Sequence, residues 1–227
     1  MADATPAIAL EGLERRFGDR PALRGVSVTV AEGQTLAVFG ANGAGKTTLL
    51  RVLATLLRPH AGAVSVLGAA LPGESWRVRG RVGFLGHEPL VYADLTAREN
   101  LLFHARLHRV GAARVEQLLD AVGLAPRAGD PVRELSRGMV QRLAAARAVL
   151  HDPALLLLDE PRAGLDPAAA EELEPLIGRS SGRTRVLVTH DVERGLREAD
   201  AVLGLRAGAA ELAGGRAAAG DVRRLYA

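Results

Sequence analysis

The chain has 227 residues, with 29 Lys and Arg against 26 Asp and Glu, so its formal net charge is +3. This near balance and an aromatic share of only 3% argue against a nucleic-acid partner, which is bound by basic surfaces with stacking aromatic rings. The absence of cysteine excludes disulfides and thiolate metal sites, residues 1–6 show no leader pattern, and no apolar run is long enough to cross a bilayer.

Short apolar strands alternate with amphipathic helices along the chain. The first part predicts strands at 8–10 and 22–30 with a connection at 13–19, a strand at 35–39, a helix at 48–54, a strand at 63–67, a short helix at 76–79 and a strand at 81–85. Helices are expected next at 96–108, 112–122 and 139–150. The last part predicts a strand at 154–158, a helix at 167–178, a strand at 185–188, a short helix, a strand at 201–205 and a helix at 221–225.

This alternation of strands and helices implies an α/β fold with a mostly parallel sheet that is covered on both faces. We expect a single domain, residues 1–227, in which residues 1–88 and 151–227 form the α/β core. Residues 89–150 are expected to form an inserted helical subdomain. Thr96 and Glu99 have the spacing of a capping box, which predicts that the first helix of this insert begins there.

Residues 40–48 read Gly-Ala-Asn-Gly-Ala-Gly-Lys-Thr-Thr, which fits the phosphate-binding loop pattern of Gly, four residues and Gly-Lys-Thr. Glycines allow backbone angles and a close approach that a Cβ would block. The N–H groups of the loop can then surround an anion at the N-terminus of the following helix. A glycine turn with an incidental Lys is the alternative, which the flanking strand and helix disfavour. The glycines expected to bind the nucleotide are Gly40, Gly43 and Gly45.

Polar side chains of the same loop are expected to bind the rest of the phosphate chain. Lys46 is predicted to reach the β- and γ-phosphates, and the Thr47 hydroxyl is predicted to bind Mg²⁺. Thr48 is expected to contact the α-phosphate, and Asn42 is included among the nucleotide-binding residues.

A second candidate site element is the run of four leucines at 155–158 followed by Asp159 and Glu160. It predicts a buried parallel strand that ends in a polar site at its carboxyl edge, where α/β proteins bind ligands. Asp159 is expected to hold Mg²⁺ through water, and Glu160 to polarise the attacking water. The alternative is a strand that simply ends in an acidic loop. The presence of the phosphate-binding loop disfavours it.

Residues 135–138 read Leu-Ser-Arg-Gly and precede the helix predicted at 139–150. Ser136 and Gly138 at a helix N-terminus can form an anion site, although these residues alone favour a plain N-cap.

The order of these parts, together with Gly-Leu-Asp at 164–166 and Val-Thr-His at 188–190, resembles the nucleotide-binding subunit of ATP-binding-cassette (ABC) transporters over essentially the whole chain. The resemblance implies a phosphate-loop NTPase fold of ABC type, with a mostly parallel core, an antiparallel β portion and an inserted helical subdomain. It also implies ATP and Mg²⁺ as cofactors.

Further roles follow from this resemblance, residue by residue. Phe17 matches the aromatic residue that stacks on adenine, although a core Phe is the alternative. Ser136 and Gly138 match the signature that contacts the γ-phosphate of ATP held by another subunit. Asp166 matches the loop that links the two subunits. His190 matches the histidine that contacts the γ-phosphate and the attacking water.

Three departures from the family pattern stand out. Arg137 and Met139 replace the Gly and Gln of the usual Leu-Ser-Gly-Gly-Gln, and Arg162 stands where Thr or Ser is common. His87 occupies the place of the usual Gln that senses Mg²⁺ and the attacking water, and a neutral imidazole partly replaces an amide in hydrogen bonding. Because a protonated imidazole would repel Mg²⁺, we predict that hydrolysis falls when His87 gains a proton.

The resemblance also implies partners and a location. A second copy of the ATPase is expected to pack head to tail, and a separate transmembrane permease to hold the pair at the cytoplasmic face of the membrane. The Gly-His-x-Pro form at 86–89 and the segment 94–100 are similar to the ATPase of the haem exporter used in cytochrome c maturation. Exporters of drugs, polysaccharides or other cargo stay open as alternatives.

Two other function classes are weighed against a transporter ATPase. A soluble ABC ATPase acting on DNA or the ribosome would carry a long coiled-coil insert or two cassettes, and the sequence has neither pattern. A regulatory subunit that binds ATP without turnover is disfavoured by the suitable residues Lys46, Asp159, Glu160 and His190. The departures from the family pattern at residues 87, 137 and 139 leave this regulatory alternative open.

Overall fold

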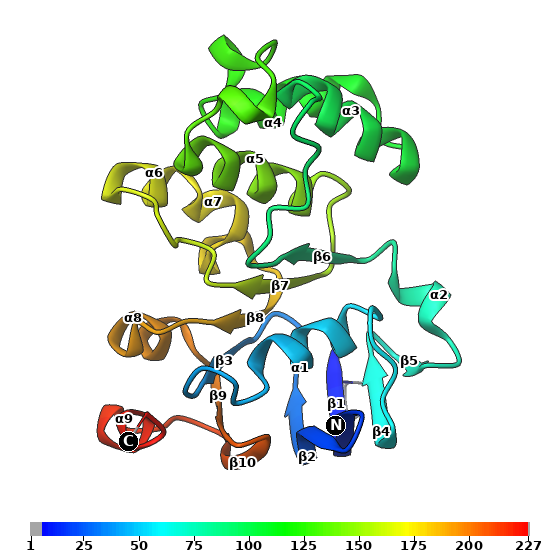
Figure 1. Ribbon diagram of the computed structural model, residues 1–227, viewed down its shortest axis with the longest axis vertical. Coiled ribbons are helices and arrows are strands. Elements are labelled where there is room, and N and C mark those ends of the chain that lie inside the picture. Colours follow the sequence, from blue (N-terminus) through cyan, green and yellow to red (C-terminus); the bar gives the residue numbers. More distant parts are fainter. Residues whose placement is uncertain (1–5, 227) are drawn as a thin grey trace.

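The computed structural model describes residues 6–226. Residues 1–5, for which the sequence shows no leader pattern, and residue 227 lie outside the described part. Two sheets lie at the base of the molecule as it is drawn in Figure 1, and helices of the chain's middle third lie above them. Within residues 6–226, none of the helices combines the length and apolar character that a membrane span requires.

A six-stranded sheet forms the centre of the fold, in the order β10-β9-β3-β8-β7-β6, and its neighbouring strands are parallel except for β10 and β9. Alternate residues of β7 point to opposite faces: Leu155 and Leu157 join the cluster that contains α1, while Leu156 and Leu158 join the cluster that contains α5. A continuous apolar run therefore suits this strand, because both of its faces are covered. The strands are β3 (Thr35–Phe39), β6 (Val82–Leu85), β7 (Leu155–Asp159), β8 (Thr184–Val188), β9 (Ala201–Arg206) and β10 (Ala209–Gly214).

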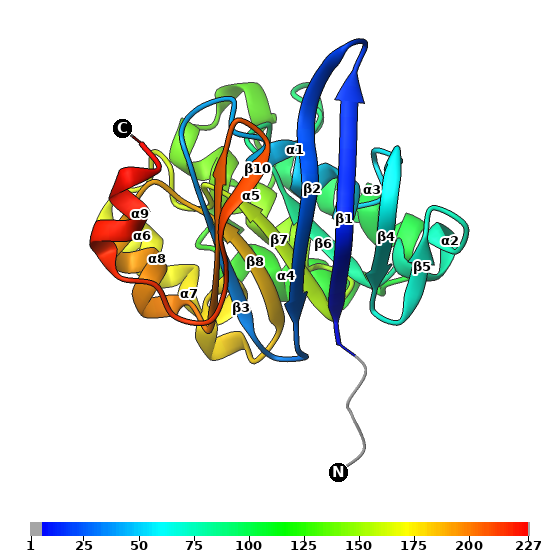
Figure 2. The same cartoon turned by 90° about the horizontal axis from the view of Figure 1, so that it is seen from below.

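An antiparallel sheet in the order β2-β1-β4-β5 lies beside it, and Figure 2 shows β2, β1 and β4 side by side. The sequence predicted only residues 8–10 as the first strand, whereas β1 continues to Phe17 and turns into β2 at Gly18. Register shifts between Leu10 and Leu13, with Gly12 at a φ of 61°, break the alternation on which that prediction relied. The strands are β1 (Ile8–Phe17), β2 (Arg20–Val30), β4 (Ala61–Val66) and β5 (Ala69–Leu71).

Helices cover both faces of the six-stranded sheet. One apolar cluster joins α1 to the antiparallel sheet and to one face of the central sheet, and a separate cluster holds α8 and α9 against β3 and β9. The single helix predicted at 167–178 is divided into α6 and α7, because Pro175 in the first turn of α7 has no N–H for the preceding turn. These helices are α1 (Lys46–Leu53), α2 (Ser75–Val78), α6 (Pro167–Glu172), α7 (Glu174–Ile177), α8 (Val192–Glu198) and α9 (Ala219–Arg224), with a 3₁₀ turn at Arg179–Ser181.

The helical segment contains α3 (Ala97–His108), α4 (Ala112–Ala121) and α5 (Arg137–Val149), with 3₁₀ turns at Ala125–Arg127 and Val132–Glu134. The predicted capping box is present, since Thr96 and Glu99 each accept a hydrogen bond from the other's backbone N–H. Helix α5 packs in one cluster with α3, α4 and a face of the central sheet, so it joins the helical segment to the core. The subdomain limits at 89 and 150 stay a prediction.

Candidate nucleotide-binding site

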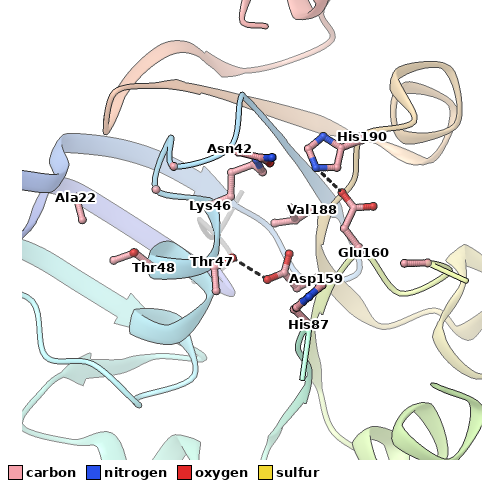
Figure 3. Close-up of a pocket in the computed structure, with 13 residues that line it drawn as sticks. Ala22, Asn42, Lys46, Thr47, Thr48, His87, Asp159, Glu160, Val188 and His190 are labelled. Carbon is pink, nitrogen blue, oxygen red and sulfur yellow. Dashed lines mark hydrogen bonds and ion pairs between the residues drawn. The ribbon is translucent and has the colours of Figure 1, made fainter. Parts of the chain in front are cut away.

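A cavity of about 510 Å³ lies at the carboxyl ends of the parallel strands β3, β7 and β8 (Figure 3). Parallel strands place the residues that follow them at one edge of the sheet, which explains how segments distant in the sequence meet here. Its lining residues are Ala22, Asn42, Gly43, Gly45, Lys46, Thr47, Thr48, His87, Asp159, Glu160, Ala163, Val188 and His190.

The glycine loop connects β3 to α1. At two of its positions, neighbouring backbone leaves no room for any side chain. Gly40 has a φ of 145°, and a Cβ there would lie 2.2 Å from the carbonyl oxygen of Leu205. Gly45 precedes α1 with a φ of 107°, and a Cβ there would lie 2.5 Å from the carbonyl oxygen of Ala22. Any other residue at these positions would displace the loop from β2 or β9.

Lys46 is 8% exposed and folds back over its own loop. Its Nζ donates hydrogen bonds to the carbonyl oxygens of Gly40 and Ala41, at 2.6 and 2.9 Å. Burial lowers the pKa of Lys46, while Asp159 and Glu160 act in the opposite direction. The ammonium is therefore only partly hydrated and lies beside the N-terminus of α1, where a phosphate would be attracted by both.

Thr47 and Asp159 place two oxygen ligands next to each other. The Thr47 hydroxyl donates to Asp159 Oδ2 at 2.8 Å, although the two residues come from α1 and β7. Mg²⁺ is held in proteins by one or two such oxygens together with phosphates and waters, so this donor set fits it. Between residues 6 and 226, no group of three His, Cys, Asp or Glu side chains is placed to hold a metal ion.

Glu160 follows β7 in a left-handed conformation with a φ of 51°. Burial, and secondarily Asp159, raises the pKa of Glu160 to about 7, while Lys46 acts in the opposite direction. Glu160 Oε1 lies 3.5 Å from His190 Nε2, and the two side chains point toward each other in Figure 3. Burial, followed by the charge of Lys46, lowers the pKa of His190, which favours the neutral imidazole. A carboxyl with a pKa of about 7 suits a general base.

His87 follows β6 and lines the same cavity, beside Asp159 in Figure 3. The prediction that this imidazole senses Mg²⁺ rests on the sequence. Its catalytic role stays a prediction.

Five of the predicted nucleotide-binding residues are not among those that line this cavity, and Gly40 at the start of the glycine loop is one of them. Ser136 is the N-cap of α5, and its hydroxyl accepts a hydrogen bond from the Met139 N–H. Gly138 lies in the first turn of the same helix. Asp166 caps α6 by accepting from the Ala169 N–H. Phe17 is 48% exposed at the end of β1, with the Arg15 guanidinium 5.0 Å from its ring centroid. The Phe17 ring therefore lies at the surface of the part of the chain that the structure describes, and not in its core.

Sequence reasoning missed Tyr226, which follows α9. Its hydroxyl accepts a 3.4 Å hydrogen bond from the N–H of Gly40, and its ring centroid lies 6.0 Å from that of His190. No local pattern indicates this contact, because the hydrogen-bonded residues are 186 positions apart. Ala22, Ala163 and Val188 also line the cavity without any sequence signal of their own.

Comparison with known proteins gives consistent matches. The family model described as "ABC transporter" matches residues 23–163. A daunorubicin resistance ATP-binding protein of Streptomyces coeruleorubidus is 42% identical over 92% of this chain and 67% of its own length. Nod factor export ATP-binding protein I of Ralstonia nicotianae is 39% identical over 87% of this chain and 63% of its own. The chain thus spans about two thirds of the length of these relatives.

A solved structure described as a dimeric, post-hydrolysis state of an ATP-binding cassette bound to ADP and Pi shares 26% identity with this chain, at a TM-score of 0.81. The match covers 90% of this chain and 96% of that one. It confirms the predicted α/β fold with its parallel core, antiparallel portion and helical segment. The family model and this nucleotide-bound cassette confirm ATP with Mg²⁺ as the cofactors that the sequence predicts. The chain belongs to the ABC transporter family, as one of its ATP-binding and ATP-hydrolysing subunits.

Proposed function

We propose that this chain hydrolyses ATP to power a membrane transporter that exports its cargo. The observation that carries the proposal is the meeting of five side chains from three segments of the chain in one cavity. They are Lys46, Thr47, Asp159, Glu160 and His190. The names of two relatives, one for drug resistance and one for Nod factor export, favour export over import.

Each side chain has a distinct task in this mechanism. Lys46 binds the terminal phosphates and offsets charge that develops on the γ-phosphate. Thr47 and Asp159 would hold Mg²⁺, which would offset the negative charge of the phosphates. Glu160 accepts hydrogen bonds from the attacking water and orients it for in-line displacement, and His190, whose Nε2 lies 3.5 Å from Glu160 Oε1, would contact the γ-phosphate.

A second copy of the chain is proposed to complete the site. Ser136, Gly138 and Asp166 lie at helix N-termini outside the cavity, where a facing subunit's nucleotide could meet them. ATP that bridges both copies favours the closed dimer, and hydrolysis removes that bridge. The dimeric cassette with ADP and Pi supports this arrangement.

A transmembrane permease is the second proposed partner. A groove of about 520 Å³ adjoins the nucleotide cavity, because Thr47 and His87 line both. Its wall includes Leu56 and Leu90, which are 60% and 46% exposed. An apolar groove of this kind suits a short helix of the permease. His87 would then sense both the docked helix and the nucleotide, at the cytoplasmic face of the membrane.

Haem export is a narrower form of the proposal. It rests on the Gly-His-x-Pro form at 86–89 and on residues 94–100. The relatives named above concern a drug and Nod factor, which favours the wider group of drug, polysaccharide or other exporters that the sequence left open.

The test is phosphate release from ATP by the purified chain, followed by affinity purification from membranes. We expect turnover that requires Mg²⁺ and a multi-spanning protein that purifies with the chain. Glu160→Gln is expected to bind ATP and accumulate a dimer without turnover. A chain that binds ATP without any turnover would instead support the regulatory alternative, and association with DNA or ribosomes would support the soluble one.

A further inference from the structure

Arg162, two residues after Glu160, is a departure from the family pattern that the sequence leaves without an explanation. In the structure its guanidinium lies between two carboxylates. Nη2 is 2.5 Å from Glu174 Oε2, and Nη1 is 3.0 Å from Glu198 Oε1. The Arg162 side chain is only 14% exposed. A charge this buried is held by its partners, so the position of residue 162 is tied to α7 and to the end of α8.

Glu198 in turn anchors this contact to the central sheet. Its other oxygen, Oε2, is 3.0 Å from Arg185 Nη1. Arg185 is on β8, is 1% exposed, and also donates to the Thr35 hydroxyl of β3 at 2.9 Å. Arg194 adds a 3.2 Å contact to Glu198 Oε1. The network therefore connects the segment after β7 to two strands of the sheet through side chains that are mostly buried.

Both ends of this connection lead to the nucleotide cavity. The Ala163 N–H donates to the Glu160 carbonyl at 3.0 Å, which closes a turn around Arg162. Glu198 is the last residue of α8, whose N-cap, Asp191, directly follows His190. Helix α8 packs closely against β3, since even a Cβ at Gly195 would lie 2.6 Å from the Phe39 ring. Arg162 thus braces the turn of the proposed base against the helix that follows the histidine.

We propose that Arg162 is a positioning residue for ATP hydrolysis. The left-handed conformation of Glu160 is strained for a residue with a side chain, and such strain persists only where the surroundings hold it. Arg162 supplies that restraint through Glu174 and Glu198, so that the Glu160 carboxylate stays opposite His190. The inference rests on the proposed roles of Glu160 and His190 in the same site.

The experiment compares Arg162→Ala with a matched control, Arg183→Ala. Arg183 is also a partly buried arginine, 19% exposed and 2.5 Å from Asp152, but it precedes β8 at the sheet edge away from the cavity. We expect Arg162→Ala to lower kcat at least tenfold per folded molecule while KM for ATP changes less than twofold. Arg183→Ala is expected to leave both within twofold. Urea unfolding supplies the folded fraction of each variant.

Arg162→Lys keeps the charge but lacks the planar fork that reaches both carboxylates, so its kcat is expected to lie between those of the wild type and Arg162→Ala. It also supplies the comparison if Arg162→Ala does not fold. In a double-mutant cycle with Glu198→Gln, the two losses of kcat should be less than additive, because both variants lose the same Arg162–Glu198 contact. Equal losses in the Arg162 and Arg183 variants, or additive losses in the cycle, would overturn the inference. A wild-type chain without turnover would overturn the proposed function instead.

Discussion

The substitution Glu160→Gln separates the cost of holding a carboxylate in the cavity from its proposed catalytic use. Burial, followed by the charge of Asp159, raises the pKa of Glu160 from 4.5 to about 7, against the opposing effect of Lys46. The ionised carboxylate is therefore less stable in the nucleotide-free fold than in the unfolded chain. Gln has almost the same shape without the charge, so we expect it to stabilise the protein while it abolishes turnover.

The size of this gain depends on pH in a defined direction. A raised pKa means that the stability from neutral Glu160 is fully present below pH 4.5 and is lost as pH rises through about 7. At about 1.4 kcal/mol per pH unit, the stability lost is about 3 kcal/mol at pH 8 and about 1 kcal/mol at pH 5.5. The advantage of Gln in the free energy of unfolding should therefore increase by about 2 kcal/mol between these two pH values.

The measurement is urea unfolding of wild type and Glu160→Gln without nucleotide or Mg²⁺, at both pH values, with phosphate release as the activity assay. Glu171→Gln, which removes an exposed carboxylate on α6, is the control for loss of a surface charge. An advantage of Gln that is the same at pH 5.5 and 8 would show that the cavity does not disfavour the ionised carboxylate. Turnover near the wild-type rate would refute the assignment of Glu160 as base.

Three further outcomes are expected. Lys46→Ala should lower ATP affinity at least tenfold in equilibrium binding, because a charge-assisted contact to phosphate is worth about 1.5–3 kcal/mol; unchanged affinity would exclude the phosphate role. His87→Gln should change the Mg²⁺ concentration that turnover requires, and an unchanged Mg²⁺ requirement would contradict a sensing role for the imidazole. Ser136→Arg should abolish hydrolysis without unfolding the chain, at a cost of about 1 kcal/mol for the lost N-cap of α5, while a mixture of Ser136→Arg and Lys46→Ala chains should regain part of the activity through one intact composite site. If the mixture stays inactive, or if Ser136→Arg alone keeps turnover, the second subunit does not contribute Ser136.

Most of the elements were predictable because their patterns are local. The buried run of β7 and the capping box of α3 each lie within six residues, and the structure contains both. The prediction failed where neighbouring strands impose the conformation. The irregular part of β1 is extended because it pairs with β2 and β4, and the short strand β10 forms on β9. Pairing of this kind comes from partners far along the chain, so no short window contains its signal.

The sequence by itself determined the chemistry of this protein. Gly40, Gly45, Lys46 and Thr47 fix a phosphate loop because their spacing matches the backbone shape that surrounds an anion. It also indicated that two carboxylates end a buried strand.

Only the tertiary structure decided how these parts meet. Thr47 and Asp159 are 112 positions apart in the sequence. The Thr47 hydroxyl nevertheless lies 2.8 Å from Asp159 Oδ2, because β3, β8 and β7 are neighbours in one sheet. The same packing raises the pKa of Glu160 and gives Arg162 its two carboxylates. Strand order, burial and charge proximity depend on the whole chain at once. A local pattern can therefore name the groups of the site, while the fold sets their distances and their ionisation.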